Sequence, residues 1–174
     1  MKVYEVQPPQ QLELLEERIS MEKPVKVLPA KRVNIVSLKL VKESSILYKE
    51  RSVRSPEDGY KLLKQFLEDA DREHFIVVSL NTKNQPVSIN VCHIGSLNAS
   101  IVHPREVMKS AILSNAASII VGHNHPSGRV EPSKEDIEVT KRLVEAGKII
   151  GIDVLDHIIV GDETYTSLKE KGYI

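Results

Sequence analysis

Apolar residues along this chain alternate in some segments and recur at helical intervals in others, which predicts a mixture of strands and helices. Alternating or β-branched runs predict strands at residues 33–41, 44–50, 74–80, 87–94, 118–125 and 152–161. Apolar residues three and four positions apart predict helices at residues 56–71, 104–117 and 133–147. We expect the first two strands to pair with each other, and the third and fourth to form a hairpin of two core strands. The fold class is therefore α/β, with a mixed sheet flanked by helices.

Residues with known terminal preferences support the helix boundaries. Ser55 is placed to cap the first helix, with Pro56 in its first position, and Pro104 begins the second helix. We expect Gly147 to stop the third helix. One face of the second helix carries the apolar residues Val107, Met108, Ala111 and Ile112.

Length and composition favour one domain of ordinary size. The chain has 174 residues, of which 41% are hydrophobic, and this is enough for a packed core. The first 32 residues include a proline-containing segment of linker composition and are predicted to form an N-terminal arm. Residues 33–174 are predicted to form the domain, with its motif-bearing core at about residues 55–174. A dimer contact, a self-inhibitory segment and a docking strand are all open roles for the arm.

Charge and cysteine content limit the partners and the compartment. The chain has 24 basic and 24 acidic side chains, so no surface-wide positive field for binding nucleic acid is predicted, although a local basic patch stays open. Cys92 is the single cysteine, which excludes an internal disulfide and favours a reducing compartment. The chain has neither an apolar run of about 18 residues nor a signal-peptide pattern. We therefore expect a soluble, cytoplasmic protein with no membrane partner.

Two of the six histidines, His123 and His125, are separated by one residue at the end of a predicted buried strand. Residues at i and i+2 of an extended chain face the same way, so both rings can reach one metal ion. A catalytic zinc site usually takes three protein ligands and leaves a position for water. Asp136 is the best candidate for the third ligand, because the Pro- and Gly-containing turn after His125 can bring the next helix back over the strand end.

Each of these residues also has a structural interpretation. Histidines at a strand end are often surface or hydrogen-bonded rings. The segment SKED has the pattern of a capping box, with Ser133 as the N-cap and Asp136 at N3, and that role needs no metal. Capping by Ser133 and ligation by Asp136 are compatible.

A hydrolytic zinc centre also needs a base that is not a ligand. Glu73 directly precedes a predicted apolar strand, which could bring it to the metal end of a neighbouring strand. The alternative is a solvated acid at a helix-to-strand junction. His157 lies in an apolar strand and is more often a hydrogen-bonded core histidine than a ligand; together with Asp156 it could support the site from behind.

The spacing of these residues resembles the JAMM motif of the MPN or JAB metalloproteases. Seven residues separate His125 from Ser133, and two separate Ser133 from Asp136. His123 and the upstream Glu73 complete the motif. The segments HPREVMKSAI, VGHNHPSG and PSKEDIEVTKRLVEAGKIIGIDVLDHIIVGD are similar to the bacterial RadC-like branch, historically labelled DNA repair proteins.

The resemblance implies a fold similar to that of cytidine deaminases and a Zn²⁺ ion held by His123, His125, Asp136 and a water. It implies that Glu73 is the general acid/base and that Ser133 hydrogen-bonds the water or the developing oxyanion. The implied activity is hydrolysis of an amide or isopeptide bond in a peptide or protein substrate, which the resemblance does not identify.

Other functions compete with this interpretation. A zinc nucleobase deaminase needs an H-x-E and a P-C-x-x-C segment, which a single cysteine excludes. A non-catalytic interaction module of the MPN type has a broken ligand set, whereas the set here is intact. The zero net charge argues against a DNA-repair accessory. Longer RadC-like members begin with a helix-hairpin-helix region that suggests DNA contact, and the hairpin of such a region contains glycine. This chain has no glycine before Gly59, so it lacks that hairpin. DNA is kept only as an alternative partner, and the oligomeric state is not predicted.

Overall fold

The structure is a computed structural model that describes residues 29–95 and 102–174. The described residues belong to two units, 29–37 and 38–174, and each is considered by itself. Residues 29–37 contain no regular secondary structure. Most of the predicted arm lies outside the described residues, so its boundary and role stay predictions. The fold that follows is that of the second unit.

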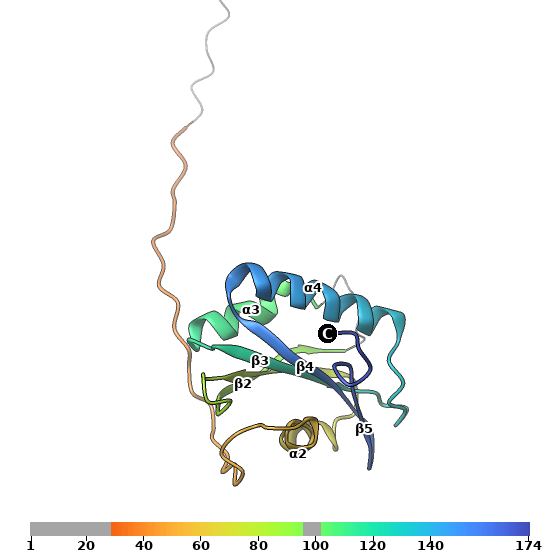
Figure 1. The fold of residues 1–174 in the computed structure, drawn as a ribbon. Coiled ribbons are helices and arrows are strands. Elements are labelled where there is room, and N and C mark those ends of the chain that lie inside the picture. The colour runs from red at the N-terminus through yellow and green to blue at the C-terminus, as the bar shows by residue number, and fades with distance from the viewer. Residues whose placement is uncertain (1–28, 96–101) are drawn as a thin grey trace, which may run out of the picture. The chain divides into compact units, whose positions relative to one another are not determined.

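A mixed sheet of five strands forms the centre of this unit, in the order β2-β1-β3-β4-β5 (Figure 1). The strands are β1 (His74–Leu80), β2 (Pro86–Ile94), β3 (Ser118–Asn124), β4 (Asp153–Val160) and β5 (Tyr165–Ser167). Only β3 and β4 pair in parallel, and the helix α4 (Lys134–Ile150) connects them. β3 is the central strand and is buried along its whole length.

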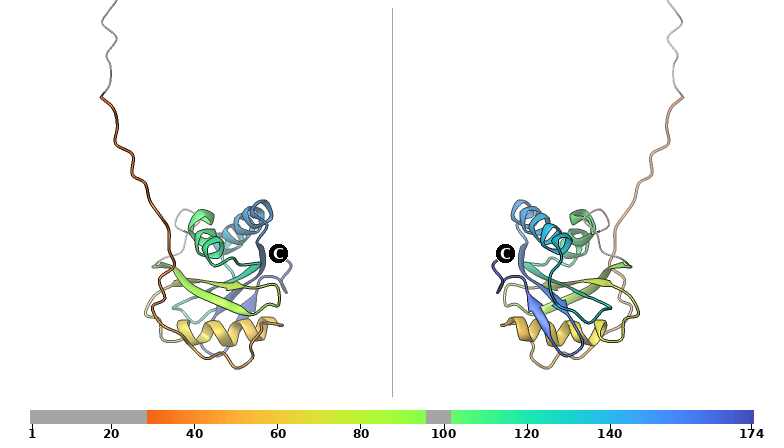
Figure 2. Two further views of the ribbon diagram at one scale, coloured as in Figure 1. Left: turned by 90° about the vertical axis from the view of Figure 1, so that its left-hand side faces the viewer. Right: turned by 90° about the vertical axis from the view of Figure 1, so that its right-hand side faces the viewer.

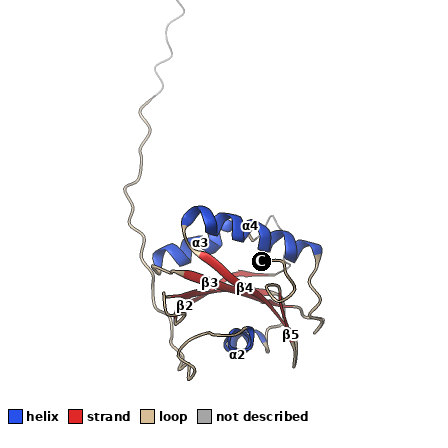
Figure 3. Ribbon diagram, in the orientation of Figure 1, coloured by secondary structure: helices blue, strands red, loops and turns tan. Residues whose placement is uncertain are grey.

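Helices cover both faces of the sheet (Figures 2 and 3). The helix α2 (Pro56–Leu67) packs on one face against β3 and β4, and α3 (Pro104–Leu113) lies with α4 on the other face. This arrangement confirms the predicted α/β class with a mixed, flanked sheet. None of the helices in the described ranges is both long and apolar enough to cross a lipid bilayer.

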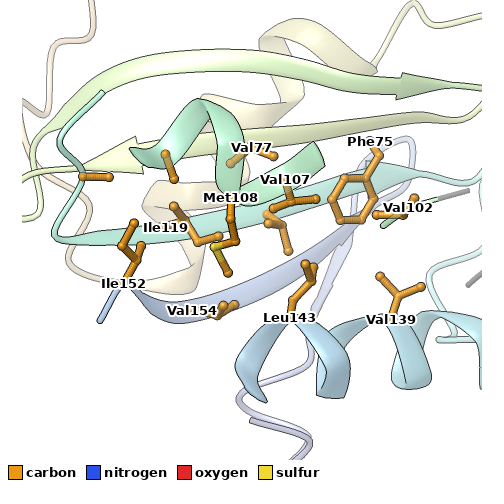
Figure 4. Close-up of a cluster of buried hydrophobic side chains, with 13 residues drawn as sticks. Phe75, Val77, Val102, Val107, Met108, Ile119, Val139, Leu143, Ile152 and Val154 are labelled. Carbon is orange, nitrogen blue, oxygen red and sulfur yellow. The ribbon is translucent and has the colours of Figure 1, made fainter. Parts of the chain in front are cut away.

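Two hydrophobic cores result, one on each side of the sheet. Phe75, Met108 and Leu143 belong to the core under α3 and α4, which Figure 4 shows. Cys92 is half-buried at the margin of that core. Leu63 and Ile158 belong to the core against α2. The sheet is thus held rigidly on both faces, which fixes the position of the strand ends that carry the site.

Local sequence predicts the helix starts correctly. Ser55 and Ser133 are the N-caps of α2 and α4, each in a complete capping box, and Pro104 begins α3. These signals are short-range hydrogen bonds and ring constraints, so they do not depend on the rest of the fold.

Two strand predictions are wrong. Residues 33–50 contain no strand, and apolar residues of this segment such as Leu38 and Leu47 are exposed, because no neighbouring strand pairs with it. The hairpin of β1 and β2 is confirmed, but β2 is an edge strand and not a core strand. Val87 and Val91 are exposed, since β2 has a partner on one side only.

Three details of the helices also differ from the predictions. α2 ends at Leu67 and not near residue 71. Ile112 of α3 is exposed, so the apolar face of this helix is narrower than its spacing predicts. α4 continues beyond Gly147 to Ile150 and ends at Gly151, whose φ of 81° is the left-handed conformation that terminates a helix.

Replacing Gly147 with Ala is expected to destabilise the fold by about 1–3 kcal/mol, although Ala normally favours a helix. A Cβ atom at this position would meet the carbonyl oxygen of Ile152, and the N–H of Ile152 is itself bonded to the Gly147 carbonyl at 3.0 Å. Chemical denaturation measures the effect. The exposed Glu145→Ala variant is the matched control and should change stability by less than about 0.5 kcal/mol. A Gly147→Ala protein as stable as wild type would contradict this close approach.

Candidate metal centre

The two closely spaced histidines lie at the end of the central strand. His123 is in β3, and His125 follows the last residue of that strand. As their spacing predicts, both rings project to one point, and their Nε2 atoms are 3.0 Å apart. His123 is completely buried beside Phe75, with ring centroids 6.3 Å apart, whereas 15% of the His125 side chain is exposed. The site therefore lies at the edge of the core under α3 and α4, with an opening on the His125 side.

Asp136 reaches the histidines from the first turn of α4. The Ser133 hydroxyl oxygen accepts a hydrogen bond from the Asp136 N–H at 3.1 Å, and the Ser133 N–H donates to Asp136 Oδ2 at 2.8 Å. The Ser133 hydroxyl also donates to Oδ2, at 2.6 Å. The helix cap thus uses Oδ2, while Oδ1 lies 3.3 Å from His123 Nε2. One carboxylate caps the helix and faces the histidines at the same time.

These three side chains have the spacing of a metal site. One potential ligand atom from each lies within 4.8 Å of the other two. Ligands about 2.0–2.1 Å from zinc at the corners of a tetrahedron are about 3.3 Å from one another. The separations of 3.0 Å between the imidazoles and 3.3 Å from imidazole to carboxylate are close to that value. The geometry and the donor set of His123, His125 and Asp136 therefore fit a divalent metal ion.

Hydrogen bonding directs a lone pair of His125 into the same space. His125 Nδ1 lies 2.8 Å from the Arg129 carbonyl oxygen, which can only accept, so Nδ1 carries the proton. The neutral ring then has its lone pair on Nε2, which faces Asp136 Oδ2 at 3.5 Å. A lone pair and a carboxylate this close together repel each other, so the arrangement favours a proton or a metal ion between them.

The pKa shifts agree with this preference. The hydrogen bond with Asp136 raises the pKa of His125, and the charge of Glu73 contributes in the same direction. Burial alone would raise the pKa of Asp136, but hydrogen bonds with the histidines and Ser133 hold it well below its ordinary value. Both shifts favour a protonated His125 beside an ionised Asp136, and binding of a metal ion to such ligands releases protons.

Glu73 approaches the site from the neighbouring strand. It directly precedes β1, in which Phe75 is the antiparallel partner of His123. Extending this register places Glu73 opposite His125, and alternation along the strand puts Glu73 on the same face as Phe75. Its side chain is half-buried. The structure thus brings Glu73 to the end of the sheet that carries the candidate metal centre, while its role as acid/base stays a prediction.

Asn124, between the two histidines, holds the backbone on both sides of Glu73. Its Oδ1 accepts from the His74 N–H at 2.8 Å, and its Nδ2 donates to the Arg72 carbonyl at 3.0 Å. The side chain is buried. The sequence does not reveal this function, because it depends on the pairing of β1 with β3.

Replacing Asn124 with Ala is expected to destabilise the protein by about 1–3 kcal/mol, because the His74 N–H and the Arg72 carbonyl lose their buried amide partner. Thermal and chemical denaturation measure the change. Asn90→Ala, at an exposed strand position, is the matched control and should be close to neutral. Equal stability of the two variants would show that water replaces the amide of Asn124 without loss.

His157 is a buried residue of β4 that bonds to a neighbour, as predicted from its apolar strand. Its Nε2 lies 2.7 Å from His123 Nδ1. Asp156 lies on the opposite face of the sheet, where its Oδ2 accepts from the Ser167 hydroxyl at 2.7 Å. Its Oδ1 accepts from the backbone N–H of His157 at 2.7 Å, so its support acts through the backbone of His157 and not through the imidazole. Burial raises the pKa of Asp156.

Thr140, whose Oγ1 lies 2.6 Å from His157 Nδ1, is not singled out by the sequence, although it lies one helical turn after Asp136.

The fold and the site match a known family. Residues 53–173 match the model of the RadC-like JAB domain, and this range includes every residue of the candidate centre. The chain belongs to the RadC-like JAB domain family. The predicted RadC-like resemblance is therefore confirmed, and the five-stranded sheet with its flanking helices is consistent with the JAB/MPN architecture.

Named relatives of this RadC-like chain come from several bacteria. It is 60% identical over 122 residues to a UPF0758 protein of Geobacillus sp. (strain WCH70), covering 70% of this chain and 54% of that protein. It is 49% identical over 156 residues to the UPF0758 protein YsxA of Bacillus subtilis (strain 168), covering 90% of this chain and 65% of YsxA. The RadC-like chain thus spans between about half and two thirds of the length of these curated relatives, whose names state no activity.

Proposed function

We propose that this chain is a zinc-dependent hydrolase of the JAMM type that cleaves peptide or isopeptide bonds. The observation that carries the proposal is the convergence of two imidazole nitrogens and a carboxylate oxygen at the spacing of a tetrahedral site. Three ligands leave one position for water, which is the arrangement of catalytic zinc sites. Membership of the RadC-like JAB domain family supports the same chemistry.

His123, His125 and Asp136 would hold the zinc ion. A zinc ion in this position would supply Lewis acidity and lower the pKa of water toward neutrality. Glu73, whose charge contributes to the raised pKa of His125, would accept the proton of the attacking water and pass it to the leaving amine. The hydrogen bonds of Asn124 to the backbone on either side keep Glu73 at this edge.

Ser133 would act at the oxygen where negative charge develops. Its hydroxyl proton points to Asp136 Oδ2 in this structure. Rotation about the Cβ–Oγ bond would redirect that proton to a substrate oxygen, while the Ser133 N–H continues to hold Oδ2 at 2.8 Å. Ser133 can therefore donate to an oxyanion without releasing the orientation of Asp136.

Metal analysis combined with a cleavage assay tests the proposal. Protein purified without chelators should contain about one zinc per chain, and it should cleave members of a peptide mixture that includes lysine-linked isopeptides. A chelator should abolish cleavage, and added zinc should restore it. A folded protein that neither retains nor takes up zinc would refute the metal site. A zinc-loaded protein that cleaves no amide bond in the mixture would instead favour a non-catalytic interaction module.

A further inference from the structure

A line of buried polar groups crosses the core behind the metal centre. His123, His157 and Thr140 are each 0% exposed and come from β3, β4 and α4. His123 Nδ1 lies 2.7 Å from His157 Nε2, and His157 Nδ1 lies 2.6 Å from Thr140 Oγ1. Thr140 Oγ1 also lies 2.6 Å from the backbone carbonyl oxygen of Asp136. The line begins at one candidate ligand and ends at the backbone of another.

The direction of these hydrogen bonds follows from the Asp136 end. A backbone carbonyl can only accept, and a threonine hydroxyl has one proton, so the proton of Thr140 points to the Asp136 carbonyl. The Thr140 oxygen must then accept from Nδ1–H of His157. The donor and the acceptor of both hydrogen bonds of Thr140 are therefore fixed.

The same reasoning continues through His157 to His123. The ring of His157 is completely buried between the Thr140 hydroxyl and the His123 imidazole, neither of which compensates a positive charge, so this ring is neutral. With its proton on Nδ1, the ring has its lone pair on Nε2, which accepts from Nδ1–H of His123. The lone pair of His123 is then on Nε2, the atom that lies 3.0 Å from His125 Nε2 and 3.3 Å from Asp136 Oδ1.

We propose that His157 and Thr140 are positioning residues that hold His123 in the tautomer whose Nε2 lone pair faces the metal position. The inference rests on the proposed function in one respect, that the centre binds a metal ion. Neither residue touches the metal or a substrate; both act through His123. They also link β4 and α4 to the ligands, so that the orientation of His123 is set by the packing of three elements.

Aromatic packing keeps the two rings in this arrangement. Phe75 stacks on His123 with centroids 6.3 Å apart and presents an edge contact to His157 at 5.5 Å. A flip of either ring would break its hydrogen bonds and leave a buried N–H without an acceptor. Loss of the partner behind a histidine ligand typically costs about 10- to 100-fold in metal affinity.

A pair of substitutions at Thr140 tests the proposal with little change in volume. Thr140→Val removes the hydroxyl that accepts from His157, whereas Thr140→Ser keeps it. We expect Thr140→Val to bind zinc about 10- to 100-fold more weakly than wild type and Thr140→Ser to bind with nearly wild-type affinity. Zinc affinity is measured by competition with a chromophoric chelator, on proteins whose folding is verified by circular dichroism.

Nitrogen NMR of the metal-free proteins supplies a readout that a purely structural role would not change. In wild type at alkaline pH, His123 should be protonated at Nδ1 and unprotonated at Nε2. In Thr140→Val this preference should weaken, and in Thr140→Ser it should be retained. A wild-type His123 protonated at Nε2 would overturn the proposal.

The outcomes separate this inference from the proposed function. Wild-type protein that binds zinc, together with equal affinities for the Val and Ser variants, would overturn the positioning role and leave the metal centre intact. Wild-type protein that takes up no zinc would overturn the proposed function, and the inference with it.

Discussion

Replacing His125 with Ala is expected to lower the zinc affinity of the folded protein by roughly 10²- to 10³-fold. A zinc site with four ligands contributes about 10–16 kcal/mol of binding free energy, or roughly 2.5–4 kcal/mol for each ligand, and about 1.4 kcal/mol corresponds to a factor of ten. His125 is the partly exposed member of the set, so its removal should leave the fold intact. The loss therefore reports on metal binding rather than on stability.

Competition with a chromophoric chelator measures this affinity for wild type and variant. His74→Ala is the matched control, because its imidazole lies on the opposite face at the start of β1 and bonds to the Arg72 carbonyl at 3.0 Å. The control should bind zinc like wild type. Unchanged affinity in His125→Ala would remove His125 from the ligand set.

Turnover should respond most strongly to Glu73→Gln, which is expected to lower kcat by about 10²- to 10⁴-fold while zinc content is unchanged. Glutamine has the size of glutamate but cannot take up a proton near neutral pH. Because Glu73 stands outside the ligand set, the metal ion should be retained. Catalysis and metal binding should therefore separate in this variant.

Parallel measurements of kcat and of zinc content check this separation. Glu138→Gln, at an exposed position of α4, is the control and should keep full activity. Loss of zinc in Glu73→Gln would show that Glu73 is a ligand, and full activity would exclude it as the base.

The parts of the fold that follow from local chemistry are predictable from the sequence. Ser55 and Ser133 form capping boxes with residues three positions later, so the starts of α2 and α4 can be read directly. The end of α4 cannot be predicted in this way, because two glycines lie near it. Gly147 allows the backbone of Ile152 to approach closely, whereas Gly151 adopts the left-handed conformation that ends the helix. Likewise, the alternating pattern of residues 33–41 resembles a strand, but a strand needs a partner that the sequence does not identify.

Some residues of the candidate site are likewise predictable from the sequence and others are not. His123, His125 and Asp136 are predictable because they lie within one short segment. The i and i+2 spacing puts both imidazoles on one side of the strand, and the short turn that follows brings Asp136 close to them. Thr140 and Asn124 are not predictable, since their importance depends on which strand lies beside which. Their hydrogen bonds join α4 to β4 and β3 to the start of β1, contacts that exist only after the sheet has formed.

All three metal-facing side chains come from one continuous stretch, residues 123–136, whereas Glu73 arrives with a separate hairpin. Under the proposed function, ion binding and bond cleavage would therefore depend on different parts of the chain. Substitution of Glu73 would then end cleavage and leave the ion site intact. A change from catalysis to recognition would not require the ion site to be rebuilt.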